Sequence, residues 1–104
     1  MLPTTITILN HTYTIAEVDP GLWNREGIGR SNVLSGQIEL RRDSTEDLKR
    51  TTLLHEFVHQ VGEILDLPPL RDDEHVVSVL AIAFYQFLMQ DPDIVEWITK
   101  RQFE

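Results

Sequence analysis

The sequence predicts one small α+β domain over residues 1–104, in which a short N-terminal β-sheet packs on about three helices. A chain of 104 residues has the size of a single domain with one core. Up to residue 40 the chain is rich in β-forming residues that roughly alternate with polar ones, which indicates strands. After residue 43 the apolar residues recur at helical spacing, so strands and helices occupy separate parts of the chain.

The N-terminal strands are expected on both sides of a tight turn. Residues 4–9 and 12–15 are β-rich, and Asn10-His11 between them suits a hairpin. Asp19-Pro20-Gly21 is typical of a turn, and residues 23–36, which are rich in Gly, Ser and Asn, are expected to form a loop. Polar and apolar residues then alternate in a predicted half-buried strand made of Gln37, Ile38, Glu39 and Leu40.

The first long helix is expected to begin after Asp43 or Ser44. Either residue can cap it, and Glu46 or Asp47 can close a capping box three residues later. The helix should end before the double proline at residues 68–69, because proline cannot continue a helix. Its apolar residues recur at helical spacing and are Leu54, Val58, Val61 and Leu65.

A second helix is predicted from about residue 72 to residue 90. Its centre, VVSVLAIAFYQFLM, is apolar on nearly every face, so we expect it to be the central buried element. A short last helix begins at Asp91-Pro92, with the aspartate as cap and the proline at the first helical position. Its apolar residues are expected to fold against the core, and they are Ile94, Trp97 and Ile98.

The composition excludes several kinds of site. The chain has no cysteine, which removes disulfides, iron–sulfur clusters, thiolate zinc sites and cysteine nucleophiles. Its net charge of −8 disfavours binding to the phosphate backbone of a nucleic acid, so we expect no nucleic-acid partner. The N-terminus lacks a signal-peptide pattern, and the longest apolar stretch, residues 76–89, is shorter than the ~20 residues of a membrane span. We therefore expect a cytoplasmic protein without a membrane partner.

The segment LHEFVHQVG, residues 54–62, contains a HExxH motif. His55 and His59 are four residues apart, so on an α-helix both imidazoles point the same way and can reach one cation. Zn²⁺ accepts such nitrogen ligands at ~2.0–2.1 Å. Glu56 is rotated ~100° from His55 and lies beside the metal, where a general base can take a proton from the water that the metal activates. The motif therefore predicts a zinc site with a base next to it.

The same residues also have a purely structural interpretation. A histidine pair on a helix that carries Leu54 and Val58 could be partly buried and hydrogen-bonded. Gly62 argues against this interpretation, because glycine inside a helix costs ~1 kcal/mol relative to alanine unless a neighbouring segment approaches closely. A metal site is also favoured by the second helix, which follows after a turn and opens in acidic residues.

A zinc site of this kind needs a third protein ligand downstream. The metzincin pattern would place it at Leu65, which cannot coordinate a metal, and Asp66 comes one residue late. Glu74 lies in the first turn of the second helix, which can pack antiparallel on the first and return this carboxylate to the histidines; alternatively, Glu74 only stabilises the helix dipole. His75 is a further candidate, rotated ~100° from Glu74. The spacing favours Glu74.

Two segments, LLHEFVHQVGEILDL and EHVVSVLAIAFYQFLMQDPDIVEWI, with a short proline-containing turn between them, resemble the small gluzincin-like zinc metallopeptidases. These minigluzincins occur as short phage- or prophage-type proteins and are similar to the peptidase domain of the ImmA/IrrE group. The resemblance covers residues 37–97. It implies a zincin-like fold with HExxH on the first long helix and a glutamate as third ligand, which supports Glu74. It also implies a strand along the substrate cleft, which matches residues 37–40 and would bind an extended peptide by strand addition.

The resulting hypothesis is a zinc-dependent metallopeptidase whose partner is a peptide or protein substrate. His55, His59 and Glu74 would hold one Zn²⁺, and Glu56 would act as base and then as proton donor to the leaving amine.

Stabilisation of the oxyanion in such an enzyme has no obvious donor in the sequence. Tyr85 and His75 are candidates, and His11 and Asn32 are more remote ones. Two alternatives therefore stay open: a zinc-binding regulatory or interaction protein with little or no proteolysis, and a SprT-like protease with three histidine ligands. The sequence predicts neither the substrate nor the oligomeric state.

Overall fold

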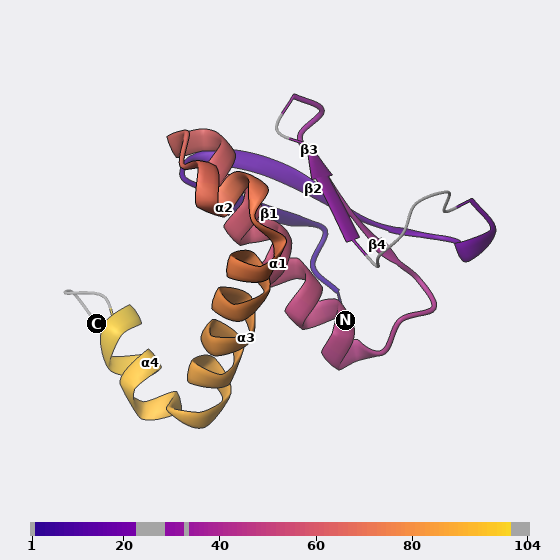
Figure 1. The fold of residues 1–104 in the computed structure, drawn as a ribbon. Helices are drawn as coiled ribbons and strands as arrows, with labels where there is room; N and C mark the ends of the chain where they lie inside the picture. The colour runs from indigo at the N-terminus through magenta and orange to yellow at the C-terminus, as the bar shows by residue number, and fades with distance from the viewer. Residues whose placement is uncertain (1, 23–28, 33, 101–104) are drawn as a thin grey trace.

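The protein has a small α+β fold, made of a mixed four-stranded sheet and four α-helices (Figure 1). The computed structural model describes residues 2–22, 29–32 and 34–100. The strands are β1 (Thr5–Ile8), β2 (His11–Val18), β3 (Gly29–Asn32) and β4 (Gln37–Arg41). The helices are α1 (Glu46–Leu65), α2 (Pro68–Asp72), α3 (Glu74–Gln90) and α4 (Pro92–Thr99), and a short 3-10 helix covers Pro20–Leu22. The predicted α+β class is therefore confirmed.

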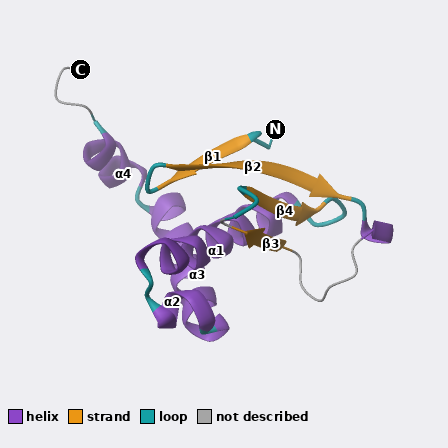
Figure 2. Cartoon of the chain, turned by 90° about the horizontal axis from the view of Figure 1, so that it is seen from above, coloured by secondary structure: helices purple, strands orange, loops and turns teal. Residues whose placement is uncertain are grey.

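The strands lie in one layer and α1, α2 and α3 in a second, as Figure 2 shows. The strand order is β1-β2-β4-β3, with β2 and β4 parallel and the other two pairs antiparallel. The predicted hairpin is confirmed, but its turn is Leu9-Asn10, one residue earlier than expected. Both residues have positive φ angles of 47° and 70°, and such turns match the right-handed twist of the strands that they join.

The apolar core lies between the sheet and α1. Its buried side chains all come from the strands and are Ile8, Tyr13, Ile15, Ile38 and Leu40. From α1, the half-buried residues Leu53, Phe57, Val61 and Ile64 pack against them. This face differs from the predicted one, because only Val61 belongs to both sets and Leu65 is 54% exposed.

The ends of α1 correct two details of the sequence analysis. Thr45, rather than Asp43 or Ser44, caps the helix, and its hydroxyl accepts a hydrogen bond from the backbone N–H of Leu48 at 3.2 Å. Because Leu48 is the third helical residue, the cap lacks the acidic side chain that would close a capping box. At the other end the chain does not simply turn at the double proline, because Pro68 begins the short helix α2.

The predicted loop of residues 23–36 contains a strand. Residues 29–32 form β3, which pairs antiparallel with β4. Glycine, serine and asparagine have low strand propensity, so the strand forms through pairing with β4 and contact with α1. Residues 23–28 and 33 of the same segment lie outside the described residues.

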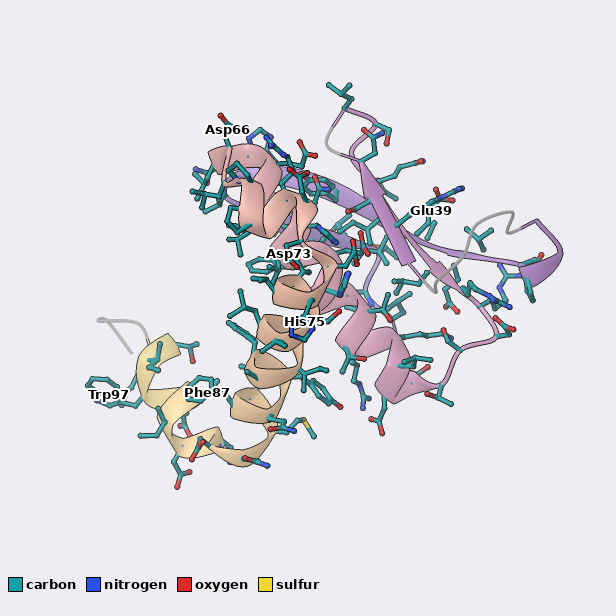
Figure 3. The ribbon with its side chains drawn as sticks, viewed as in Figure 1. Glu39, Asp66, Asp73, His75, Phe87 and Trp97 are labelled. Atoms are coloured by element: carbon teal, nitrogen blue, oxygen red, sulfur yellow. The ribbon has the colours of Figure 1, made fainter. Side chains whose placement is uncertain are left out.

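The expectation that α3 is the central buried element is wrong. Its buried residues are Val77 and Ala81, whereas the exposed large apolar residues of this helix are Val79, Leu80, Ile82, Phe84, Phe87 and Met89. Helix α4 contacts α3 and extends away from both layers, so its apolar residues do not reach the core as expected. Trp97 is 77% exposed and points away from the rest of the fold (Figure 3), and Ile94 and Ile98 are about half exposed.

A further finding concerns membranes. None of the helices in the described ranges combines the length and the apolar character that crossing a bilayer requires.

Candidate metal centre

Three predicted metal ligands meet between α1 and α3. His55 and His59 are successive-turn neighbours on α1, with ring centroids 4.8 Å apart, and Glu74 is the first residue of α3. One carboxylate oxygen of Glu74 lies 2.9 Å from Nε2 of His55, and the other lies 2.7 Å from Nε2 of His59. One ligand atom from each residue lies within 4.8 Å of the others, so the group could hold a metal ion.

Gly62 and the short helix α2 bring Glu74 to this position. A Cβ atom at Gly62 would lie 2.4 Å from the backbone nitrogen of Arg71 and 2.6 Å from the carbonyl carbon of Leu70. The close approach that Gly62 predicted is therefore confirmed, and the approaching segment is α2. Asp73 then caps α3 by accepting hydrogen bonds from the backbone N–H groups of His75 and Val76, which fixes the first turn of the helix that carries Glu74.

Both histidines are oriented through Nδ1. Nδ1 of His59 lies 3.0 Å from the backbone carbonyl oxygen of Arg71, and Nδ1 of His55 lies 3.4 Å from the hydroxyl oxygen of Ser78. When Nδ1 carries the proton, His59 donates to the Arg71 carbonyl and His55 donates to the Ser78 hydroxyl. The lone pair of Nε2 on each ring is then available to a cation. Such second hydrogen bonds are the usual way in which proteins fix the tautomer of a metal-binding histidine.

Glu56 follows His55 on α1 and is buried, at 6% exposure. Its Oε1 accepts a hydrogen bond from the hydroxyl of Ser31 at 2.6 Å. The Ser31 oxygen in turn accepts from the side-chain amide of Gln60 at 2.8 Å, and the Gln60 oxygen accepts from the hydroxyl of Tyr13 at 2.9 Å. Burial, with a smaller effect of the Glu63 charge, raises the pKa of Tyr13, which keeps its hydroxyl protonated as a donor.

Three of these residues were not predicted from the sequence: Ser31, Gln60 and Tyr13. Gln60 could have been predicted to lie near Glu56, because it follows one turn later on the same face of α1. Ser31 and Tyr13 come from strands that are far away in the sequence, so their contribution depends on the sheet topology.

The site opens into a cleft of about 590 Å³. The cleft is lined by residues of β3, α1, α2 and α3. They include Ser31 from β3, Glu56 and Thr52 from α1, and Ser78 and Ile82 from α3. The metal ligands and Glu56 therefore line the same cleft.

Asp66 and His75, the other candidate ligands, lie outside the group. The carboxylate of Asp66 accepts from the Arg71 guanidinium at 2.7 Å. Arg71 also bonds to Asp72; this pairing raises the pKa of Arg71 and lowers the pKa of Asp72. His75 is exposed and, unlike its neighbour Glu74, belongs neither to the ligand group nor to the cleft lining in the described ranges (Figure 3).

The four candidate oxyanion donors do not line the cleft in the part of the chain that the structure describes. Tyr85 lies eleven residues after Glu74, or ~16 Å along the helix, and its hydroxyl donates to Asp47 at 3.1 Å. The side chain of Asn32 accepts from the backbone N–H groups of the following turn. His11 is exposed at the start of β2, and His75 is excluded by its position on α3.

The predicted substrate strand also needs correction. Gln37, Ile38, Glu39 and Leu40 lie in β4, and all four pair with β2 on one side and with β3 on the other. A peptide cannot add to a strand whose two edges are already paired. The edge strand beside the cleft is β3, which the sequence analysis had assigned to a loop.

No protein-family model, no curated protein and no solved structure matches this chain. Support for a function therefore comes from the geometry of His55, Glu56, His59 and Glu74 and from the chemistry of their side chains.

Proposed function

We propose that this chain is a zinc-dependent metallopeptidase with a zincin-like, gluzincin-type site. One observation carries the proposal: two histidines and a glutamate from separate helices converge in a cleft, and a buried carboxylate, Glu56, lines the same cleft. A metal site without catalysis would not require that second carboxylate.

The donor set fits Zn²⁺. Two imidazoles and one carboxylate are a ligand set of catalytic zinc sites, which leave a fourth position open. Zinc–ligand bonds of ~2.0–2.1 Å place the ligand atoms of a tetrahedron roughly 3.3 Å apart. The distances of 2.7 and 2.9 Å between Glu74 and the histidines are slightly shorter, so a small rotation of the Glu74 carboxylate would create the required space.

Bound Zn²⁺ would act as a Lewis acid that lowers the pKa of water and polarises a carbonyl group. Glu56 takes the proton from the attacking water while the oxygen adds to the scissile carbonyl carbon. The carbon–nitrogen bond then breaks, and Glu56 returns the proton to the leaving amine. An extended peptide would reach this site by pairing with the outer edge of β3, because β4 is already paired on both sides.

Metal content and hydrolysis test the proposal separately. We expect protein purified without chelator to contain one zinc per chain by mass spectrometry. Glu56→Gln should keep the zinc and lose hydrolysis of a library of fluorescence-quenched peptides, because the amide cannot take a proton. Hydrolysis that survives in Glu56→Gln would show that Glu56 is not the base, and absence of zinc in the native protein would refute the site.

A matched pair of variants separates this proposal from a SprT-like site with three histidines. Glu74→Ala should lose zinc, whereas His75→Ala should retain it, because His75 is exposed and lies outside the ligand group. The reverse result would favour the three-histidine site.

A second function, a zinc-binding regulatory or interaction protein, is favoured by one observation. Among the described residues, none of the candidate oxyanion donors lines the cleft, and such donors often supply a large part of the rate. A partner that remains bound and uncleaved after prolonged incubation with the zinc-loaded protein would support this function over the peptidase.

A further inference from the structure

We propose that Ser31 and Gln60 are positioning residues that hold the Glu56 carboxylate in one orientation. The inference rests on the proposed function, in which Glu56 is the base. The observation behind it is the continuous hydrogen-bonded chain from Tyr13 through Gln60 and Ser31 to Glu56, with distances of 2.9, 2.8 and 2.6 Å.

The direction of this chain is fixed by chemistry. An ionised carboxylate only accepts hydrogen bonds, so the single hydroxyl proton of Ser31 goes to Glu56. The Ser31 oxygen must then accept from Gln60, which requires the NH₂ end of the amide to face Ser31. The amide oxygen therefore faces Tyr13, whose hydroxyl donates to it.

Burial makes the bond between Tyr13 and Gln60 necessary, because the two residues are 1% and 3% exposed and water cannot easily replace a missing partner. Glu56 is 6% exposed and Ser31 is half-buried, and both line the cleft. Buried polar groups without a partner are strongly disfavoured. Gly29 allows the chain to close, because a Cβ atom at this position would lie 2.3 Å from the Thr52 side chain, and β3 could not then approach α1 so closely.

The consequence for Glu56 is an unequal environment of its two oxygens. Oε1 is held by Ser31, whereas Oε2 receives no hydrogen bond from the described residues, and Glu56 is part of the cleft lining. One oxygen is therefore fixed by the fold and the other is left for the proton transfer. Fixing a reacting group in a productive orientation contributes directly to the rate, and small misplacements reduce it strongly.

The first test uses Ser31→Ala in the zinc-loaded chain, with Ser35→Ala as matched control. Ser35 lies on the exposed turn after β3, and among the described residues its hydroxyl bonds only to the backbone carbonyl of Asn32. Three-bond NMR couplings report the rotamers of Glu56, and the quenched-peptide library gives kcat and KM. In Ser31→Ala we expect several Glu56 rotamers and a kcat lower by about 10- to 100-fold, with full zinc content and little change in KM.

Two further variants separate positioning from a general structural role. Ser31→Thr keeps the hydroxyl and should restore one Glu56 rotamer and most of kcat. Gln60→Met has a similar length but no hydrogen-bond donor, so the Ser31 hydroxyl loses the bond that fixes it. This variant should reproduce the Ser31→Ala result even if Ser31→Ala folds poorly. Ser35→Ala should behave as the native chain.

The outcomes distinguish this inference from the proposed function. If Glu56 keeps a single rotamer in both Ser31→Ala and Gln60→Met, the positioning role is refuted, whatever the activity. If the zinc-loaded native chain cleaves no peptide, the proposed function fails. The Glu56 rotamers then still decide whether Ser31 and Gln60 orient this carboxylate.

Discussion

At Gly62 of α1 the backbone of α2 approaches closely. Any side chain there would overlap the backbone of Leu70 and Arg71, and backbone cannot move aside as a flexible side chain can. The same α2 segment supplies the carbonyl that orients His59. A change at Gly62 should therefore affect both stability and metal binding.

We expect Gly62→Ala to lower the free energy of unfolding by roughly 1–3 kcal/mol through overpacking, although alanine alone would favour the helix by ~1 kcal/mol. Zinc affinity should fall by about 10- to 100-fold, because the Arg71 carbonyl moves away from His59. Urea denaturation and a zinc titration with a chromophoric chelator measure the two effects. Gly21→Ala is the control, since a Cβ atom there meets no atom of the described residues within 4 Å. Equal effects of both substitutions would contradict the packing argument.

The residues of the site differ in how far the sequence could predict them. His55, Glu56 and His59 lie within five residues, so the geometry of one helix was sufficient. Glu74 required only that α3 return along α1. The orientation of Glu56 could not be predicted, because it depends on Ser31, which the fold brings to α1 from a segment of low strand propensity.

Helix α3 shows that an apolar composition does not by itself determine burial. Apolar residues occur around nearly its whole circumference, but it packs on α1 through one face. In the described part of the chain, the largest apolar residues of α3 and α4 remain exposed. The sequence predicted the helix, since its formation depends on local residues. How much of the helix surface is buried could not be predicted, because it depends on how many other elements pack against the helix.

A pair of substitutions on α3 tests this assignment of its faces. Val77 is fully buried and Val79 is 51% exposed. We expect Val77→Ala to lower the free energy of unfolding by about 2 kcal/mol, from two lost methyl groups and the cavity that they leave. Val79→Ala should change it by less than ~0.5 kcal/mol. Both substitutions gain the same helix propensity, so their difference in urea denaturation isolates burial. A larger loss in Val79→Ala would mean that another surface covers this face.

At the scale of the whole molecule, α1 connects the sheet to the metal ligands. Toward the sheet it packs its apolar face on the core, and its buried Lys49 donates to Glu17 of β2 at 2.8 Å. Toward α3 it presents the two histidines to Glu74. The predicted class of fold depended on this separation of strands and helices along the chain, whereas the interior position of β4 followed from long-range pairing that the sequence pattern did not reveal.

Because its ligands come from two helices, bound zinc should stabilise the whole fold. At a free zinc concentration 100 times the dissociation constant, binding to the folded state alone adds ~2.7 kcal/mol, which corresponds to an increase in Tm of roughly 10–20 °C for a domain of this size. Differential scanning calorimetry with zinc, and again after addition of chelator, measures the shift. His75→Ala should keep the full increase and Glu74→Ala should lose most of it, since α3 is then no longer joined to the histidines. An equal Tm of the native chain with and without zinc would show that the three side chains do not bind the metal as a unit.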